Sequence, residues 1–110
     1  MARQPQRTDQ RVRLDLNNPE FQATLFTLDR KVATDVLGTL RKIHRMTWQQ
    51  LYRDSGLNWE RIASVPPPAG IEALYSLRVT RSARALAFRD GDFLRLLLVS
   101  NDHDGVYGKK

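Results

Sequence analysis

The N-terminal part of the chain alternates apolar and charged positions. Val12, Leu14 and Leu16 are each separated by a charged residue, and this period of two predicts a half-buried strand with a charged outer face. The next residues predict a helix start, with Asn18 as the N-cap and Pro19 at the first helical position. The hydrophobic pattern therefore changes from strand to helix at this point.

Apolar residues then recur at spacings of three and four, as expected for amphipathic helices. They form two stripes: Phe21, Leu25 and Leu28, followed by Val32, Val36, Leu40 and Ile43. Both one long helix and two helices that break near Asp29 fit this pattern, and a helical hairpin is favoured for a chain of this size. Gly38 lies inside the second stripe, where it weakens the helix and suggests close packing.

Residues 47–70 predict a short helix and a stiff loop. Thr47 and Gln50 match a capping box, and the helix should end near Asp54. Trp48 and Trp59 could stack on nucleic-acid bases, but burial in the core is the favoured interpretation. The sequence SVPPPAG at 64–70 predicts a loop rather than a linker between domains, because too little chain follows to fold separately.

Three strand-like runs follow, at Leu74–Thr80, Arg84–Arg89 and Asp92–Ser100. Asp90-Gly91 predicts a two-residue hairpin of type I′, which needs positive φ at both positions. The last run is apolar on both faces, which is typical of a central strand. The order of elements predicts an α+β fold: a small antiparallel-rich sheet with an N-terminal strand, a helical hairpin on one face and three C-terminal strands.

Composition and charge limit the possible functions. The chain has 110 residues, 41% of them hydrophobic, so we expect a flexible basic arm at 1–10 followed by one folded domain at 11–110. It has no cysteine and only two histidines, so we expect neither a metal site nor a cofactor. No apolar run is long enough to cross a membrane, and the expected location is the cytoplasm. The net charge of +6 favours nucleic acid or an acidic protein as partner.

Arginines mark the predicted sheet as the candidate site. Arg78 points away from the core side of its strand, and Arg81 and Arg84 flank the next connection. Arg84 is two residues before Leu86, so in a strand with strict alternation both side chains should lie on the same face, the core side. Only a bulge or a position at the strand end would turn Arg84 away from the core. Arg95 lies among leucines, where it must pair, reach solvent or face a ligand. Such arginines are also common on a solvated sheet face.

Metal-free RNA cleavage needs a base, cations on the phosphate and an acid. Arginines suit the phosphate. His103 could act as base or acid, and Tyr107 could stack on a base or donate a proton. Both residues also have simpler interpretations, as an exposed histidine and as a tyrosine that packs the tail.

The C-terminal third resembles the RelE/ParE superfamily of bacterial toxin–antitoxin toxins. The resemblance lies in the run LYSLRVTRSARALAF, the run LRLLLVSNDHDGVY and the order of elements. It implies that Arg84 holds the scissile phosphate, with Arg78 at a basic position of the preceding strand. His103 and Tyr107 fall at the family's tail positions. Arg81, Lys109 and Lys110 would add contacts to RNA phosphates.

The resemblance also implies partners and an activity. RelE-like members cleave mRNA at the ribosome, so we expect a metal-independent mRNA endonuclease that a cognate acidic antitoxin neutralises in a hetero-oligomer. The alternatives are a ParE-like toxin that inhibits DNA gyrase without nuclease activity, and a non-toxic basic RNA-binding domain. The segment Thr47–Gly70 is longer than in a minimal family member, and its role stays open.

Overall fold

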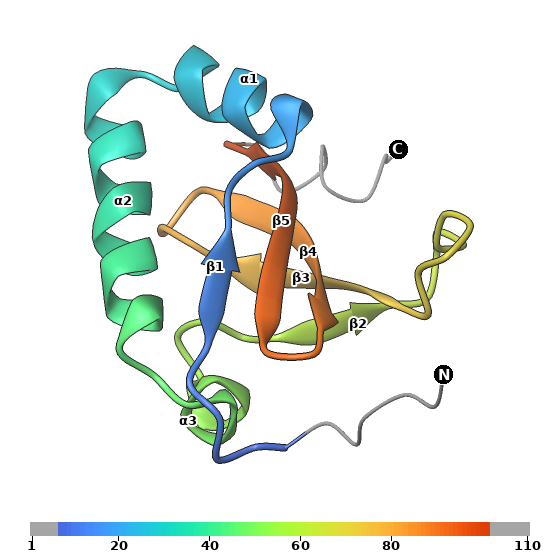
Figure 1. Ribbon diagram of the computed structural model, residues 1–110. Coiled ribbons are helices and arrows are strands. Elements are labelled where there is room, and N and C mark those ends of the chain that lie inside the picture. The colour runs from blue at the N-terminus through green and yellow to red at the C-terminus, as the bar shows by residue number, and fades with distance from the viewer. Residues whose placement is uncertain (1–6, 102–110) are drawn as a thin grey trace.

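Helices cover one face of a five-stranded sheet (Figure 1). The computed structural model describes residues 7–101. The strand order is β1-β5-β4-β3-β2; β1 runs parallel to β5, and all other neighbours are antiparallel. The elements are β1 (Arg13–Asp15), α1 (Pro19–Thr27), α2 (Arg30–His44), α3 (Trp48–Arg53), β2 (Glu60–Ile62), β3 (Leu74–Arg78), β4 (Arg84–Asp90) and β5 (Phe93–Ser100). The predicted α+β class is confirmed, and β5 is an interior strand between β1 and β4, although β4 is the middle strand of the sheet.

Local capping chemistry sets the helix starts where the sequence predicts them. The Asn18 side chain accepts hydrogen bonds from the first backbone N–H groups of α1. Asp29 does the same for α2 through Val32 N, so the helical region is divided into two helices, with the break near Asp29 that the favoured interpretation expected. Thr47 and Gln50 form the complete capping box at α3. Each cap satisfies N–H groups that have no partner within the helix.

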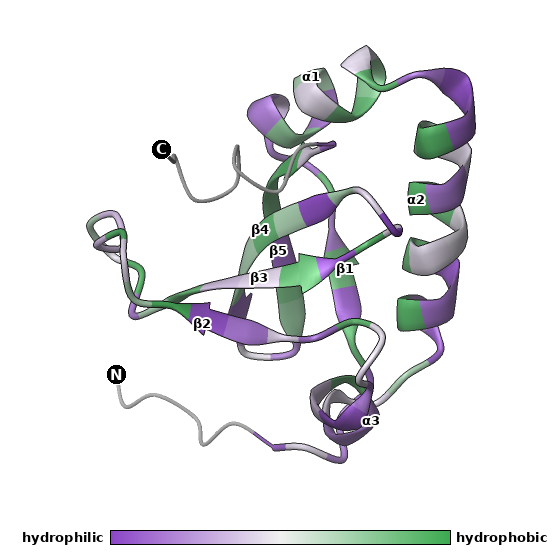
Figure 2. Ribbon diagram, turned by 180° about the vertical axis from the view of Figure 1, so that it is seen from behind, coloured by the Kyte–Doolittle hydropathy of each residue, from purple (hydrophilic) through white to green (hydrophobic). Residues whose placement is uncertain are grey.

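The main hydrophobic core lies between the helices and the sheet. Figure 2 shows the hydrophobic positions of α2 turned toward the sheet and its hydrophilic positions turned away. The helices supply Phe21, Leu25, Val36, Leu40, Ile43, Trp48 and Leu51, and the strands supply Leu77, Ala85, Ala87, Leu94, Leu96 and Val99. Trp48 is fully buried, as the favoured interpretation expected, and Trp59 packs against this core.

The orientation of β4 differs from the expectation. Ala85 and Ala87 face the helices and are fully buried, so Leu86 and Phe88 lie on the opposite face of the sheet. That opposite face is called the open face below. The expectation that Arg84 would point toward the core was therefore wrong: it projects from the open face by ordinary alternation and needs no bulge. A register shift does occur, but it lies at Leu86/Ala87.

Strand β2 was not predicted. It lies within the segment Thr47–Gly70 and adds an antiparallel edge strand beside β3, with Ile62 paired to Leu74. These two side chains are buried in a second, smaller apolar cluster, against which Val65, Ile71 and Leu86 pack. The long segment thus extends the sheet by one strand.

Two predictions about glycines were wrong. The predicted two-residue hairpin does join β4 to β5, but its turn consists of Gly91 and Asp92, one position later than predicted, because Asp90 pairs with Phe93. Within this turn only Gly91 has positive φ (61°), so the predicted type I′ turn at Asp90-Gly91 is not formed. Gly38 does not mark close packing, since a Cβ added there would meet no atom within 4 Å.

Candidate functional site

Three arginines meet at the β3–β4 connection. Arg78 ends β3, Arg84 begins β4 and Arg81 lies in the turn between them. Together with Ser82 they line a hollow of about 260 Å³, called the arginine hollow below. No carboxylate lines it among the described residues. The structure thus brings these three predicted site residues together around one hollow, and their role there stays a prediction.

The turn that carries Arg81 and Ser82 is held firmly by hydrogen bonds. The Thr80 hydroxyl accepts from Ser82 N at 3.1 Å and from Ala83 N at 2.9 Å. Val79 N donates to Ala83 O at 2.9 Å, and the Thr39 hydroxyl of α2 donates to Val79 O at 2.5 Å. Val79 and Ala83 are buried in the core. The turn therefore presents its two polar side chains from a fixed support.

Arg84 differs from an ordinary surface arginine. Its Nη1 is buried and has no hydrogen-bond partner within residues 7–101. A buried donor without a partner costs about 1–3 kcal/mol, and more when it is charged. Arg78 lies directly opposite it in the strand register, which adds like-charge repulsion. An anion in the arginine hollow would relieve both costs, because guanidinium groups bind phosphate oxygens in bidentate fashion.

The remaining predicted site residues are not placed. His103, Tyr107, Lys109 and Lys110 lie outside the described residues. The last described residue, Asn101, lies beside the arginine hollow, since the Ser82 hydroxyl donates to its Oδ1 at 2.9 Å. Ser100 is the register partner of Arg84. Sequence reasoning did not single out Ser82 as a lining residue, and only its position between Arg81 and Arg84 could have indicated it.

Arg95 has a structural role. Its guanidinium donates to Asp15 at 2.6 Å and to Asp90 at 2.9 Å, so it pairs, which was one of the three possibilities. A backbone hydrogen bond from Asn17, followed by the bond from Arg95, holds the pKa of Asp15 below its usual value. With its charge balanced by two carboxylates, Arg95 is a poor candidate for binding an anion.

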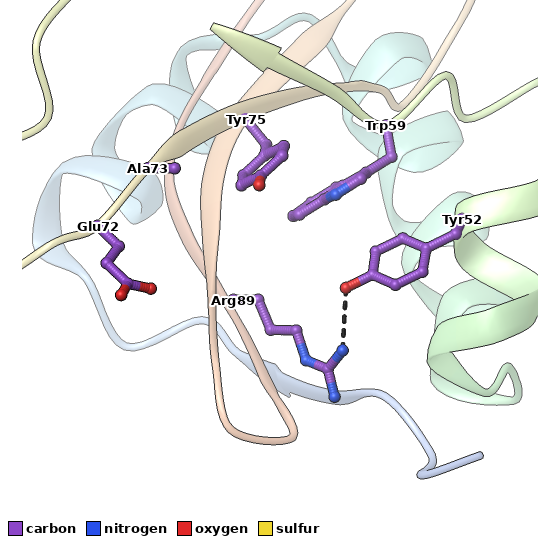
Figure 3. A pocket seen from close by; sticks show the side chains of 6 residues that line it. All are labelled: Tyr52, Trp59, Glu72, Ala73, Tyr75 and Arg89. Carbon is purple, nitrogen blue, oxygen red and sulfur yellow. Dashed lines mark hydrogen bonds between the residues drawn. The ribbon is translucent and has the colours of Figure 1, made fainter. Parts of the chain in front are cut away.

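A second hollow of about 70 Å³ lies between α3 and the strands that carry Tyr75 and Arg89 (Figure 3). Its lining includes Tyr52, Trp59, Tyr75 and Arg89. The rings of Trp59 and Tyr75 are stacked, with their centroids 4.5 Å apart. Sequence reasoning missed this cluster because Tyr52 and Arg89 are far apart in the chain and meet only in the fold.

The Arg89 guanidinium is already engaged. It donates to Tyr52 Oη at 2.9 Å, to Gly91 O at 2.7 Å and to Arg7 O at 2.6 Å, and lies 4.3 Å from the Trp48 ring centroid. It thereby holds the described part of the predicted N-terminal arm against α3. We interpret this hollow as a structural clamp.

Among residues 7–101, no three His, Cys, Asp or Glu side chains gather in a way that could hold a metal ion. In the same part of the chain, no helix has the length and apolar character needed to cross a membrane.

The fold is similar to a known toxin–antitoxin structure. The chain matches one from the crystal structure of the archaeal RelE-RelB complex from Pyrococcus horikoshii OT3, with a TM-score of 0.53 and 13% identity. The match covers 84% of this chain and 93% of that one. No model of a protein family matches the sequence, and no curated protein does. At this identity the likeness establishes the fold, and the predicted RelE/ParE-like fold is confirmed.

Proposed function

We propose that this protein is the toxin of a toxin–antitoxin pair and that it inhibits translation in the cytoplasm by cutting mRNA at the ribosome. The arginine hollow carries the proposal: Arg78, Arg81 and Arg84 present three cations, and the buried Nη1 of Arg84 has no partner within residues 7–101. The likeness to a structure of RelE with RelB supports the toxin class and an antitoxin as partner.

The proposed reaction uses only side chains of this chain and the RNA. Arg84 and Arg78 hold the scissile phosphate and stabilise the added negative charge of its five-coordinate state. The ribose 2′ oxygen forms a bond to phosphorus as it loses its proton, and the bond from phosphorus to the 5′ oxygen breaks. His103 and Tyr107 are the groups proposed to take the first proton and to donate one to the leaving oxygen, in whichever order. Arg81, Lys109 and Lys110 contact neighbouring phosphates.

The decisive experiment is induced expression followed by primer extension on a translated message. Wild type should arrest growth and produce cuts at codon positions, while Arg84→Ala should lose both effects. Arg30→Ala is the matched control, because Arg30 is exposed on α2, away from the arginine hollow. Growth arrest by the double variant His103→Ala/Tyr107→Ala at the wild-type level would refute the assigned acid–base roles. Intact mRNA combined with DNA-damage signalling would instead indicate gyrase as the target.

A further inference from the structure

The arginine hollow contains a hydroxyl group as well as its cations. Ser82 lines it together with Arg78, Arg81 and Arg84. The Ser82 side chain is exposed on the β3–β4 turn, and the hydrogen bond that its hydroxyl donates to Asn101 is exposed too. A hydrogen bond in contact with water contributes little to stability, because water replaces either partner. The hydroxyl of Ser82 is therefore accessible and can give up its bond to Asn101.

The other hydroxyl groups near the hollow are tied into the fold. The Thr80 hydroxyl accepts hydrogen bonds from two backbone N–H groups of the turn, and the Thr39 hydroxyl donates to the backbone just after β3. Ser76 is fully buried, and Ser100 is part of β5 and does not line the hollow. Within residues 7–101, Ser82 is thus the residue that combines an exposed hydroxyl with a position in the hollow.

A phosphoryl group on this hydroxyl would enter a cationic environment. Among residues 7–101 no carboxylate lines the hollow, and none of its three arginines forms an ion pair. A phosphoserine carries a charge of about −1.5 to −2 at neutral pH and three strong acceptor oxygens. Guanidinium groups bind such oxygens in bidentate fashion. The phosphate would therefore balance most of the charge around it, including that of Arg84, whose buried Nη1 has no partner in this part of the chain.

We propose that Ser82 is a phosphorylation site and that its phosphate switches the arginine hollow off. This inference rests on the proposed function, because it names a regulation of the same site. In the modification, Ser82 Oγ forms a bond to the γ-phosphorus of a nucleoside triphosphate, and the bond from that phosphorus to the bridging oxygen breaks. The hydroxyl proton passes to a base of the modifying kinase, and the nucleoside diphosphate leaves. The attached phosphate then occupies the place proposed for the scissile phosphate of the RNA.

The attached phosphate inhibits in two ways. It competes for the arginines at a high effective concentration, because it belongs to the same molecule. Its charge also repels the phosphates of an approaching RNA. The sequence around Ser82 suits a kinase with an acidic substrate cleft, since Arg81 directly precedes the serine and Arg78 lies four residues before it.

Protein that carries phosphoserine at position 82 tests the switch directly. Its cleavage of mRNA on programmed ribosomes should be slower than that of the unmodified protein, on the order of a hundredfold, and phosphatase treatment should restore it. Phosphoserine at position 64 is the matched control, because Ser64 is exposed in the β2–β3 loop and does not line the hollow. Equal cleavage by the two phosphorylated proteins would overturn the inhibition.

The phosphate itself gives a measurement that does not depend on RNA cleavage. Arginines beside it favour its dianion, so phosphorus NMR should show a second pKa that is lower at position 82 than at position 64, by about one unit or more. Equal pKa values at the two positions would overturn the contact with the arginines. Unmodified protein that cut no mRNA would refute the proposed function instead, and the pKa comparison would still decide the phosphate contact.

Two further experiments test the charge and the occurrence of the modification in cells. Ser82→Asp should lose much more of the growth arrest than Ser82→Asn, which has the same size without the charge. Equal losses would contradict inhibition by charge. Mass spectrometry of the protein isolated from its native cells should find phosphate on Ser82, and its absence in both growing and arrested cells would overturn the phosphorylation site.

Discussion

Arg78 and Arg84 are paired directly across the antiparallel register of β3 and β4, so two guanidinium groups project from the same place on the open face. Like charges at opposite positions destabilise a sheet. Arg95 on the neighbouring strand β5 differs, because two carboxylates balance its charge. Among residues 7–101 no carboxylate lines the arginine hollow, so the charges of this pair would be balanced by a bound polyanion, and without one the pair lowers stability.

Replacing one of these arginines should separate stability from activity. Arg84→Leu removes both the like-charge repulsion and the buried Nη1 without a partner among the described residues. We expect the free energy of unfolding to stay level or to rise by up to about 1 kcal/mol, while mRNA cleavage is lost. Urea denaturation and primer extension measure the two effects. A loss of about 2 kcal/mol on unfolding would mean that Arg84 supports the fold instead.

The parts of the fold that depend on local chemistry were predictable. Asn18 and Thr47 cap their helices as predicted, through side-chain contacts within three residues. The break near Asp29 was also expected, and Asp29 itself caps α2. The gathering of Arg78 and Arg84 was equally accessible, since a short connection between neighbouring strands brings their ends together.

Features that depend on distant contacts could not be predicted in this way. Strand β2 has three residues, and only its pairing with β3 and the burial of Ile62 hold it in place. The direction in which Arg84 points depends on which face of β4 the helices cover. The larger apolar residues of β4, Leu86 and Phe88, lie on the face that the helices leave uncovered, so the sequence pattern indicated the wrong face. Tyr52 and Arg89 meet across 37 residues of chain. His103 and Tyr107 lie outside the described residues and stay predictions.

Two glycines should respond in opposite directions to the same change. Gly38 lies in α2 with open space where an alanine methyl group would stand, so Gly38→Ala should raise the free energy of unfolding by about 0.5–1 kcal/mol. Gly91 has a φ of +61°, a backbone conformation that residues with a side chain rarely adopt, so Gly91→Ala should lower the free energy of unfolding. Thermal unfolding of both variants measures the difference. A stabilised Gly91→Ala would contradict the turn geometry.

The alanines on the helix-facing side of β4 should resist enlargement. Ala87 is fully buried between the sheet and the helices, so Ala87→Leu should lower the free energy of unfolding by about 1–3 kcal/mol through overpacking. Ala23→Leu on the exposed surface of α1 is the control and should change it by less than about 0.5 kcal/mol. Chemical denaturation compares them. Equal stabilities would show that the helices can move away from β4 at little cost.

Protonation of Asp15 should contribute to the loss of folding stability at acidic pH. Its backbone bond from Asn17 and its bond from Arg95 lower its pKa in the folded state, so the unfolded chain binds the proton more readily. The stabilisation is present above the ordinary carboxyl pKa of about 3.9 and is lost as the pH falls through the lower folded value. Asp15→Asn should therefore cost up to about 1 kcal/mol at neutral pH and progressively less in acid. Asp35→Asn, at the exposed pair with Lys31, is the control. Urea denaturation from neutral to strongly acidic pH measures the difference in free energy of unfolding between Asp15→Asn and wild type. A difference that stayed constant over that range would mean that Asp15 stabilises the fold through packing and not through its charge.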